Sequence, residues 1–407
     1  MKNGWQRKHI GDLCEVIAGQ SPEGKFYNAE CKGMPFYQGK KDFGEKFIEA
    51  PTTWTTQTTK VAQEGDILMS VRAPVGPVNF ATEEVCIGRG LAAIRSGTDL
   101  NRDFLFYQLL HLQPDIAGKE GAVFASINKS EIEALPLAFA PLPEQQRIVC
   151  ILDEAFEGIV TAKANAEKNL KNSRALFESH LQSVFTQRGK GWVETTLEKV
   201  LAVQPQNGWS PPAANHSDSG TPVLTLSSVT GFRFRPDKLK FTSASTDSRR
   251  KYWVKNGDFL ITRSNTPELV GHVAIASGIN EPTIYPDLIM RMNPEPDRMM
   301  TEFLYYQMRS PSLRKEITGR AQGANPTMKK ISNGAVKTLP IAVPSIATQR
   351  VIVKTLNGLE DETQHLEFIY QQKLAALEAL KKSLLHQAFS GQLTMDHGQR
   401  AMRKSVS

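Results

Sequence analysis

The chain contains 407 residues, with 49 Lys and Arg side chains against 42 Asp and Glu, so its formal net charge is +7. Hydrophobic residues make up 40% and charged residues 22%, a composition typical of a folded globular protein and not of a disordered chain. At roughly 100–200 residues per domain, this length predicts two or three domains.

Neither a membrane span nor a secretory leader is expected. No run of about 18 apolar residues occurs, and the first residues lack the apolar stretch of a secretory signal. The four cysteines form no CxxC pair: Cys14, Cys31, Cys86 and Cys150. This spacing excludes a zinc ribbon and a disulfide framework and fits a reducing cytosol, so we expect a cytoplasmic protein.

The positive charge is unevenly distributed. Residues 1–143 carry 15 basic and 17 acidic side chains, a net charge of −2, whereas residues 189–343 carry 20 and 13, a net charge of +7. A basic segment favours polyanionic partners, since binding releases condensed counterions.

An internal repeat organises the whole chain. Six short segments recur in the same order, at an offset that rises from 187 to 204 residues. The matched segments begin at Gly4 and Gly191, Gly65 and Gly257, Phe104 and Phe303, Leu135 and Leu339, Gln146 and Gln349, and Leu176 and Leu380. Six matches in register indicate a duplicated unit of about 200 residues.

Each copy begins with a mixed α/β part that is rich in Gly, Pro, Ser and Thr. Segments 65–71 and 257–262 read as strands that follow a turn glycine. Segments 101–112 and 301–309 read as helices with polar N-caps. The fold class is therefore α+β, with two α/β domains at 1–143 and 189–343.

Each copy ends in a long helix, at 144–187 and 345–390, since no proline interrupts either segment. The second helix carries a continuous heptad of seam residues: Ile352, Leu356, Leu359, Thr363, Leu366, Tyr370, Lys373, Leu377, Leu380 and Leu384. The first carries Ile148, Leu152, Ala155, Ile159, Ala162 and Ala166, then slips by one residue to Leu170, Phe177, Leu181 and Val184. We expect helical spacers at 144–188 and 344–394, packed as an antiparallel coiled coil with pseudo-two-fold symmetry, and a flexible tail at 395–407. The alternative is that each helix packs on its own globular part.

Catalytic motifs are not convincing. Gly19 to Phe26 has the spacing of a phosphate-binding loop, but Phe26 stands where a Mg²⁺-ligating Ser or Thr is required. Asp153-Glu154-Ala155-Phe156 resembles a helicase box, yet it lies within the first heptad helix, where acidic residues are expected to be solvated. The eight histidines show no HxxxH or HExxH spacing. We therefore expect no enzymatic activity, no metal and no bound cofactor.

Candidate DNA contacts combine basic, polar and aromatic residues. Arg72 and Arg263 stand at equivalent strand ends, and arginine suits bidentate contact with guanine or phosphate; a surface ion pair is the alternative. Clusters of basic and aromatic residues suit phosphate contacts, although solvated loops explain them equally well. The cluster candidates are Tyr37, Gln38, Lys40 and Lys41, and Arg249, Arg250 and Lys251 beside Tyr252 and Trp253.

Two further segments occupy matching places before short helices, where backbone amides can hold phosphate. Their candidates are Ser126, Asn128 and Lys129, and Asn325, Thr327 and Lys329. Plain N-capping by Asn128 or Thr327 is the alternative.

With these features the sequence resembles the DNA specificity (S) subunits of type I restriction–modification enzymes, an anti-phage defence. The resemblance is carried by the duplicated Gly-Asp strand openings at 65 and 257, by the Leu-Pro and Pro-Leu-Pro-Glu-Gln-Gln-Arg-Ile-Val run at 135–149, and by the helix end at 387–393. The second copy departs from this pattern, because Pro344-Ser-Ile-Ala-Thr-Gln349 replaces the Pro-Leu-Pro-Glu-Gln run. Its helix entry is therefore expected at a different place.

The resemblance implies a non-catalytic subunit whose two target recognition domains each read half of a bipartite, asymmetric double-stranded DNA site. It implies that two methyltransferase (M) subunits and restriction (R) subunits join it, and that S-adenosylmethionine, ATP and Mg²⁺ are bound by those partners. Two alternatives remain open: a DNA-binding adaptor of another defence or methylation system, and a fragment of a single-chain methyltransferase–endonuclease.

Overall fold

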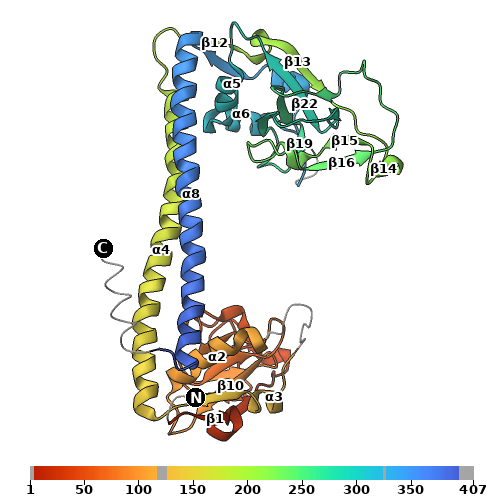
Figure 1. Ribbon diagram of the computed structural model, residues 1–407. Coiled ribbons are helices and arrows are strands. Elements are labelled where there is room, and N and C mark those ends of the chain that lie inside the picture. The colour runs from red at the N-terminus through yellow and green to blue at the C-terminus, as the bar shows by residue number, and fades with distance from the viewer. Residues whose placement is uncertain (1–3, 117–125, 324–326, 394–407) are drawn as a thin grey trace. The chain divides into compact units, whose positions relative to one another are not determined.

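The computed structural model describes residues 4–116, 126–323 and 327–393 and divides the chain into two compact units (Figure 1). Unit 1 contains Met1–Glu167 and Gln372–Ser407, and unit 2 contains Lys168–Gln371. Both long helices cross this division, so each unit holds one α/β domain and parts of two helices.

The α/β domain of unit 1 contains two small sheets and an outlying strand pair. The four-stranded antiparallel sheet has the order β2 (Cys14–Ala18), β10 (Leu91–Ser96), β7 (Ile67–Ser70) and β8 (Val78–Phe80). The five-stranded sheet has the order β3 (Tyr27–Asn28), β5 (Trp54–Thr55), β4 (Met34–Tyr37), β9 (Val85–Ile87) and β6 (Val61–Ala62). The outlying pair is β1 (Gln6–His9) with β11 (Pro136–Phe139).

Unit 2 repeats this topology and adds one outlying strand pair. Its four-stranded sheet has the order β13 (Leu201–Asn207), β22 (Ile289–Pro294), β18 (Phe259–Thr262) and β20 (Val273–Ile275). Its five-stranded sheet has the order β14 (His216–Ser217), β16 (Leu239–Thr242), β15 (Thr221–Leu224), β21 (Thr283–Ile284) and β17 (Trp253–Val254). The outlying pairs are β12 (Val193–Thr196) with β24 (Pro340–Val343), and β19 (Ser264–Asn265) with β23 (Lys329–Lys330).

The Gly-Asp openings of the central strands are tight turns closed by the aspartate. Gly65 and Gly257 have φ angles of +85° and +91°, a region that glycine adopts without strain. Asp66 is buried and accepts a hydrogen bond from the backbone N of Gln63 at 2.8 Å, and it is also held by two nitrogens of Arg95. The strands that follow, β7 and β18, are buried at every position, as expected for the centre of a covered sheet.

Shorter helices cover these sheets, and their caps partly match expectation. They are α1 (Ile10–Leu13), α2 (Arg102–Ile116), α3 (Lys129–Glu133), α5 (Thr301–Arg309), α6 (Pro311–Arg320) and α7 (Asn333–Lys337). The polar cap of α2 is confirmed, because Asn101 Oδ1 accepts from the backbone N of Asp103 and Phe104. The polar cap of α5 was wrong: its N-cap is Met300, whose side chain makes no capping bond.

The two long helices, α4 (Leu142–Thr186) and α8 (Ile346–Phe389), pack against each other in antiparallel fashion. In unit 1, Lys163 contacts Glu378 at 3.0 Å, and in unit 2, Arg174 contacts Glu367 at 3.2 Å. As the residue number rises along one helix it falls along the other, which confirms the antiparallel coiled coil.

The expected seam of α4 is confirmed, whereas that of α8 was partly wrong. Ile148, Leu152, Ile159 and Ala166 are all buried, and Phe177 and Leu181 continue the stripe after the one-residue slip. In α8, Leu356 and Thr363 are buried as expected, but Leu366 and Leu380 are 38% and 46% exposed.

The half-buried positions of α8 include three charged residues: Glu360, Glu367 and Lys381. Each is next in sequence to an expected seam residue. Glu360 pairs with Arg309, and Glu367 pairs with Arg174. Long charged side chains bury their stems while their heads form ion pairs, so hydrophobicity alone misplaces this seam.

Equivalent aromatic clusters join each domain to a helix end. In unit 1, Trp5 and Phe389 both pack edge-to-face on Phe104, with ring centroids 6.2 and 5.4 Å away. In unit 2, Phe303 lies between Trp192, tilted at 5.8 Å, and Phe185, edge-to-face at 5.5 Å. Each domain therefore packs on the C-terminal end of the helix that belongs to the other repeat.

Candidate nucleic-acid interface

The unit 1 candidates at the end of the Gly-Asp strand lie side by side. Beyond β7, the carbonyl of Val71 accepts a hydrogen bond from the backbone N of Ile127 at 3.0 Å, and Arg72 forms a β-bridge with Ser126. Arg72, Ser126 and Lys129 are all exposed. Two segments that the sequence marked separately thus form one exposed basic and polar cluster.

Unit 2 builds the same juxtaposition with different side chains. The carbonyl of Arg263 accepts from the backbone N of Ile331 at 2.9 Å, and β19 and β23 place Asn265 opposite Lys329. The Arg263 side chain is half-buried, and its Nη1 lies 3.4 Å from the carbonyl oxygen of Asp287. Within the described ranges no carboxylate pairs with Arg263, whose guanidinium faces that backbone carbonyl instead.

The two expected helix N-termini differ. Asn128 is the N-cap of α3: its Oδ1 accepts from the backbone N of Glu131 at 3.0 Å, and its own backbone N donates to Oε2 of Glu131 at 2.8 Å. The capping alternative is therefore confirmed for Asn128. It was wrong for Thr327, which is exposed, because Ser332 caps α7. Lys329 donates to the carbonyl of Gly323 at 2.9 Å, and Asn325 lies outside the described residues.

The first basic and aromatic cluster is divided between core and surface. Tyr37 is 1% exposed, and its hydroxyl donates to the carbonyl of Glu49 at 2.8 Å. Tyr37 is thus a core residue, a correction to its place among the candidates. Gln38, Lys40 and Lys41 are exposed, and the two lysines lie in the single 3-10 turn Lys40–Asp42.

The second cluster, in unit 2, remains together on the surface. Arg249 and Arg250 are 89% and 73% exposed and lie 3.1 and 4.0 Å from Asp247. The hydrogen bond from Arg249 lowers the pKa of Asp247, so this carboxylate offsets part of the local positive charge. Lys251 is exposed, and the neighbouring Tyr252 ring stacks on Trp209 at 5.2 Å.

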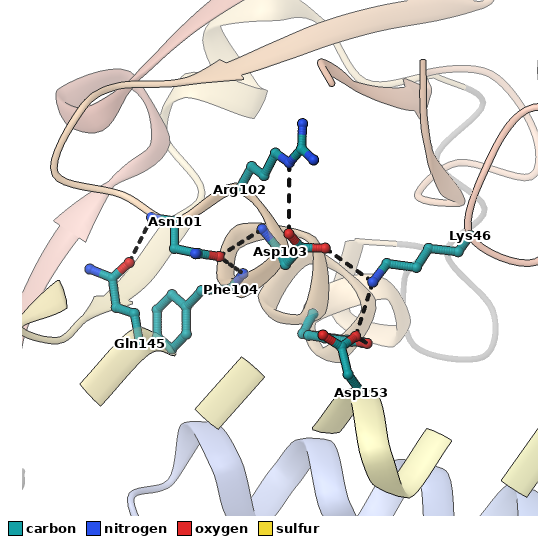
Figure 2. A network of polar contacts seen from close by, with 8 residues as sticks. Lys46, Asn101, Arg102, Asp103, Phe104, Gln145 and Asp153 are labelled. Carbon is teal, nitrogen blue, oxygen red and sulfur yellow. Dashed lines mark hydrogen bonds and ion pairs between the residues drawn. The ribbon is translucent and has the colours of Figure 1, made fainter. Parts of the chain in front are cut away.

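A partly buried polar network that sequence reasoning missed joins the domain of unit 1 to α4 (Figure 2). Lys46 lies 3.0 Å from both Asp103, on α2, and Asp153, on α4. Burial disfavours the charged ammonium, but the hydrogen bonds to Asp153 and Asp103 outweigh it and raise the pKa of Lys46. Asp153 also accepts a hydrogen bond from Tyr107, so the expectation of a merely solvated Asp153 was wrong.

The described residues offer no evident place for a metal. No cluster of three or more His, Cys, Asp or Glu side chains occurs among them. The loop with phosphate-binding spacing forms a 3-10 turn at Gly24–Phe26, too short for the helix that such a loop requires. Among these residues, no helix combines the length and the apolarity that a bilayer crossing requires.

Two copies of one α/β domain, each with a basic loop cluster and each packed on the same helix pair, define a duplicated recognition scaffold. The family model described as "Type I restriction modification DNA specificity domain" matches residues 2–172 and 189–379. The chain belongs to this family.

Relatives with this description are found in archaea and bacteria. A putative type I restriction enzyme MjaX specificity subunit of Methanocaldococcus jannaschii is 37% identical over 174 residues, which are 42% of this chain and 40% of that protein. The EcoKI specificity subunit of Escherichia coli K12 is 25% identical over 287 residues, 67% of this chain and 61% of that protein. The chain therefore spans less than two thirds of either relative. The M. jannaschii MjaVIII specificity subunit is 20% identical over 96% of this chain and 93% of its own length.

Solved structures show the same fold. A chain from a study of complex assembly and conformational transition of the type I R-M system has a TM-score of 0.78 and 19% identity, and the match covers 97% of this chain and 99% of that one. The HsdS subunit from Thermoanaerobacter tengcongensis has a TM-score of 0.58 and 18% identity over 97% of this chain and 98% of its own.

Proposed function

We propose that this chain is the specificity subunit of a type I restriction–modification complex and directs it to a bipartite, asymmetric DNA site. The observation that carries this proposal is the duplicated loop cluster. One scaffold pairs Arg72 with Ser126 in unit 1 and, at the equivalent bridge, Ser264 with Lys330 in unit 2. Arg263 therefore stands one residue before the position of Arg72, which corrects their expected equivalence. Equivalent positions with different side chains suit two domains that read different half-sites.

The candidate residues divide by the chemistry of their contacts. Arg72 and Arg263 are proposed to read base edges or phosphates, because each follows a rigid, buried strand. The exposed lysines and arginines of the two surface clusters are proposed to hold phosphates: Lys40, Lys41, Arg249, Arg250 and Lys251. Ser126, Lys129, Thr327 and Lys329 complete the proposed DNA-facing set, and Tyr37 supports it from the core.

The partners follow from the same proposal. Two M subunits and R subunits would supply S-adenosylmethionine, ATP and Mg²⁺, and this chain would itself perform no catalysis in the cytoplasm. Part of α8 supports a protein partner, since Leu366, Phe368, Ile369 and Leu380 are each more than a third exposed. Exposed apolar side chains at such density are typical of a protein interface.

Methylation mapping tests this function. Genomic adenine methylation is mapped in host cells with and without the gene for this chain. We expect deletion to abolish methylation at one sequence made of two short specified blocks and an unspecified gap. Loss of methylation at a continuous palindrome would instead refute the proposal, because two different domains on one chain do not read a symmetric site.

A further inference from the structure

A fully buried glutamine fixes the start of α4 to the domain of unit 1. Gln145 is 0% exposed, although it lies near the first turn of a helix. Its Oε1 accepts from the backbone N of Asn101 at 2.8 Å, as Figure 2 shows. Its Nε2 donates to the carbonyls of Asp99, at 3.0 Å, and Ala140, at 2.7 Å. One side chain therefore ties α4 to the segment that enters α2.

The second copy builds the same connection with a different surrounding sequence. Gln349 is also 0% exposed, and its Oε1 accepts from the backbone N of Met300 at 2.8 Å. Its Nε2 donates to the carbonyls of Arg298 and Pro344, at 2.9 and 3.0 Å. Gln145 and Gln349 each stand at the fourth residue of their helix, so the helix entry is not displaced in the second copy and that expectation was wrong. The same three hydrogen bonds of a buried amide occur in both copies, which indicates that this geometry is specific and not accidental.

Polar and charged contacts about two to three helical turns further along give each connection a second point. In unit 1, Lys46 bridges Asp103 and Asp153, as described above. In unit 2, Arg309 pairs with Glu360 at 2.7 Å, and the hydroxyl of Tyr306 lies 2.6 Å from Asn357. We call Gln145 with Lys46, Asp103 and Asp153 the first joint. The second joint is Gln349 with Arg309, Glu360, Tyr306 and Asn357.

We propose that the two joints are positioning elements that fix the angle of each recognition domain on its own stretch of helix, and thereby set which gap between half-sites is accepted. This inference rests on the proposed function. A domain held to a helix by one contact can still rotate about that contact, whereas a second contact further along the helix prevents this rotation. In the first joint Lys46 comes from the same loop as Lys40 and Lys41, so the joint also holds the proposed phosphate-binding lysines in place.

The test uses the assembled complex of this chain with M subunits and measures methyl transfer to DNA duplexes. The duplexes carry the native half-sites at the native gap, one base pair shorter and one base pair longer. The variants are Gln145→Leu, which leaves the Asn101 amide unpaired, and Lys46→Met, which removes the bridging charge. Lys46→Arg keeps the charge, and Gln146→Leu makes the same replacement at an exposed neighbouring residue.

We expect Gln145→Leu and Lys46→Met to reduce the preference for the native gap by roughly fivefold to tenfold, the equivalent of one or two lost hydrogen bonds. The preferred bases should not change, because no candidate recognition residue is altered. Lys46→Arg should restore the preference, and Gln146→Leu should retain it. A merely structural role would instead lower methylation equally at all three gaps.

Two outcomes would overturn the inference. One is an unchanged ratio of the methyl-transfer rates at the three gaps for Lys46→Met. Because Lys46 is partly exposed, this variant is expected to assemble even if Gln145→Leu does not. The other is an equal loss at all gaps for both variants. If the unaltered complex methylates no bipartite site at all, the proposed function fails instead, so the two failures are distinguishable.

Discussion

Lengthening the helix pair by one heptad should lengthen the accepted gap between half-sites. The perturbation inserts seven residues into α4 between 155 and 166 and seven into α8 at the facing level. In the two ion pairs between the helices, Lys163 with Glu378 and Arg174 with Glu367, the residue numbers add to the same total. The facing level of 155–166 is therefore 375–386. A whole heptad keeps both seams in phase.

The magnitude follows from helix geometry. Seven residues add about 10 Å at about 1.5 Å per residue. Along the duplex this corresponds to about three base pairs at about 3.4 Å per step. Three base pairs also rotate the second half-site by roughly 100° about the duplex axis, at about 10.5 base pairs per turn. The longer helix pair does not supply that rotation, so affinity should fall while the preferred gap grows by up to about three base pairs.

The assay is methylation mapping in cells that carry only the lengthened variant, with circular dichroism to verify that it folds. A matched control inserts seven residues into α4 alone. The two helices then differ in length by one heptad, so their ends no longer face each other and assembly should be abolished. The half-site bases should be the same as in the unaltered protein. An unchanged gap in a folded variant would refute the idea that the helices set the spacing, and altered bases would show that they do more than space the domains.

Three further predictions concern single side chains. Arg263→Ala should weaken DNA binding by about 1–3 kcal/mol, measured against salt; an unchanged affinity and salt slope would remove Arg263 from the interface. Burial, then the charge of a neighbouring arginine, lowers the pKa of His272 to about 4, and its Nδ1 accepts from the backbone N of Gly231 at 2.9 Å. Because the imidazole binds a proton more readily in the unfolded state, the free energy of unfolding is highest above about pH 6.5 and falls on acidification, by about 2 kcal/mol at pH 5. Urea unfolding at pH 5 and 7 should show it, and His272→Asn should reduce the difference; an equal pH dependence in both proteins would contradict the assignment. Asp66→Ala should cost about 2 kcal/mol of folding free energy, since it removes the buried carboxylate that binds the backbone N of Gln63 and leaves Arg95 paired with Glu15 alone; a cost below about 1 kcal/mol in the same measurement would show that the pair is not structural.

Local patterns in the sequence were sufficient for the repeat, the central strands and the long helices. A turn glycine followed by Asp and a run of apolar residues predicts a buried strand, and β7 and β18 are such strands. The slip in the seam of α4 after Ala166 was also predictable, because its expected seam residues are all apolar and none is charged. These features depend on interactions between residues close in sequence, so the spacing of apolar residues along the chain predicts them.

The arrangement of the candidate site depended on contacts between distant segments. Arg72 and Ser126 lie 54 positions apart, and only the β-bridge between them forms one cluster. Tyr37 looked like a surface aromatic beside Lys40 and Lys41. Its ring is nevertheless part of the core, because the backbone carbonyl of Glu49 accepts a hydrogen bond from its hydroxyl. Whether a residue with both an apolar and a polar part is buried depends on whether a buried hydrogen-bond partner is available for the polar part.

The joints were the feature least accessible from sequence. Sequence matching placed Gln146 opposite Gln349, whereas the structure makes Gln145 the equivalent residue, since Gln145 and Gln349 make the same three hydrogen bonds. Adjacent glutamines are indistinguishable by composition, and only the direction in which each leaves the helix decides which one is buried. Local sequence patterns are enough to predict two domains and two long helices. How each domain is fixed to its helices depends on tertiary contacts, because a buried polar side chain is stable only where partners from distant segments satisfy it.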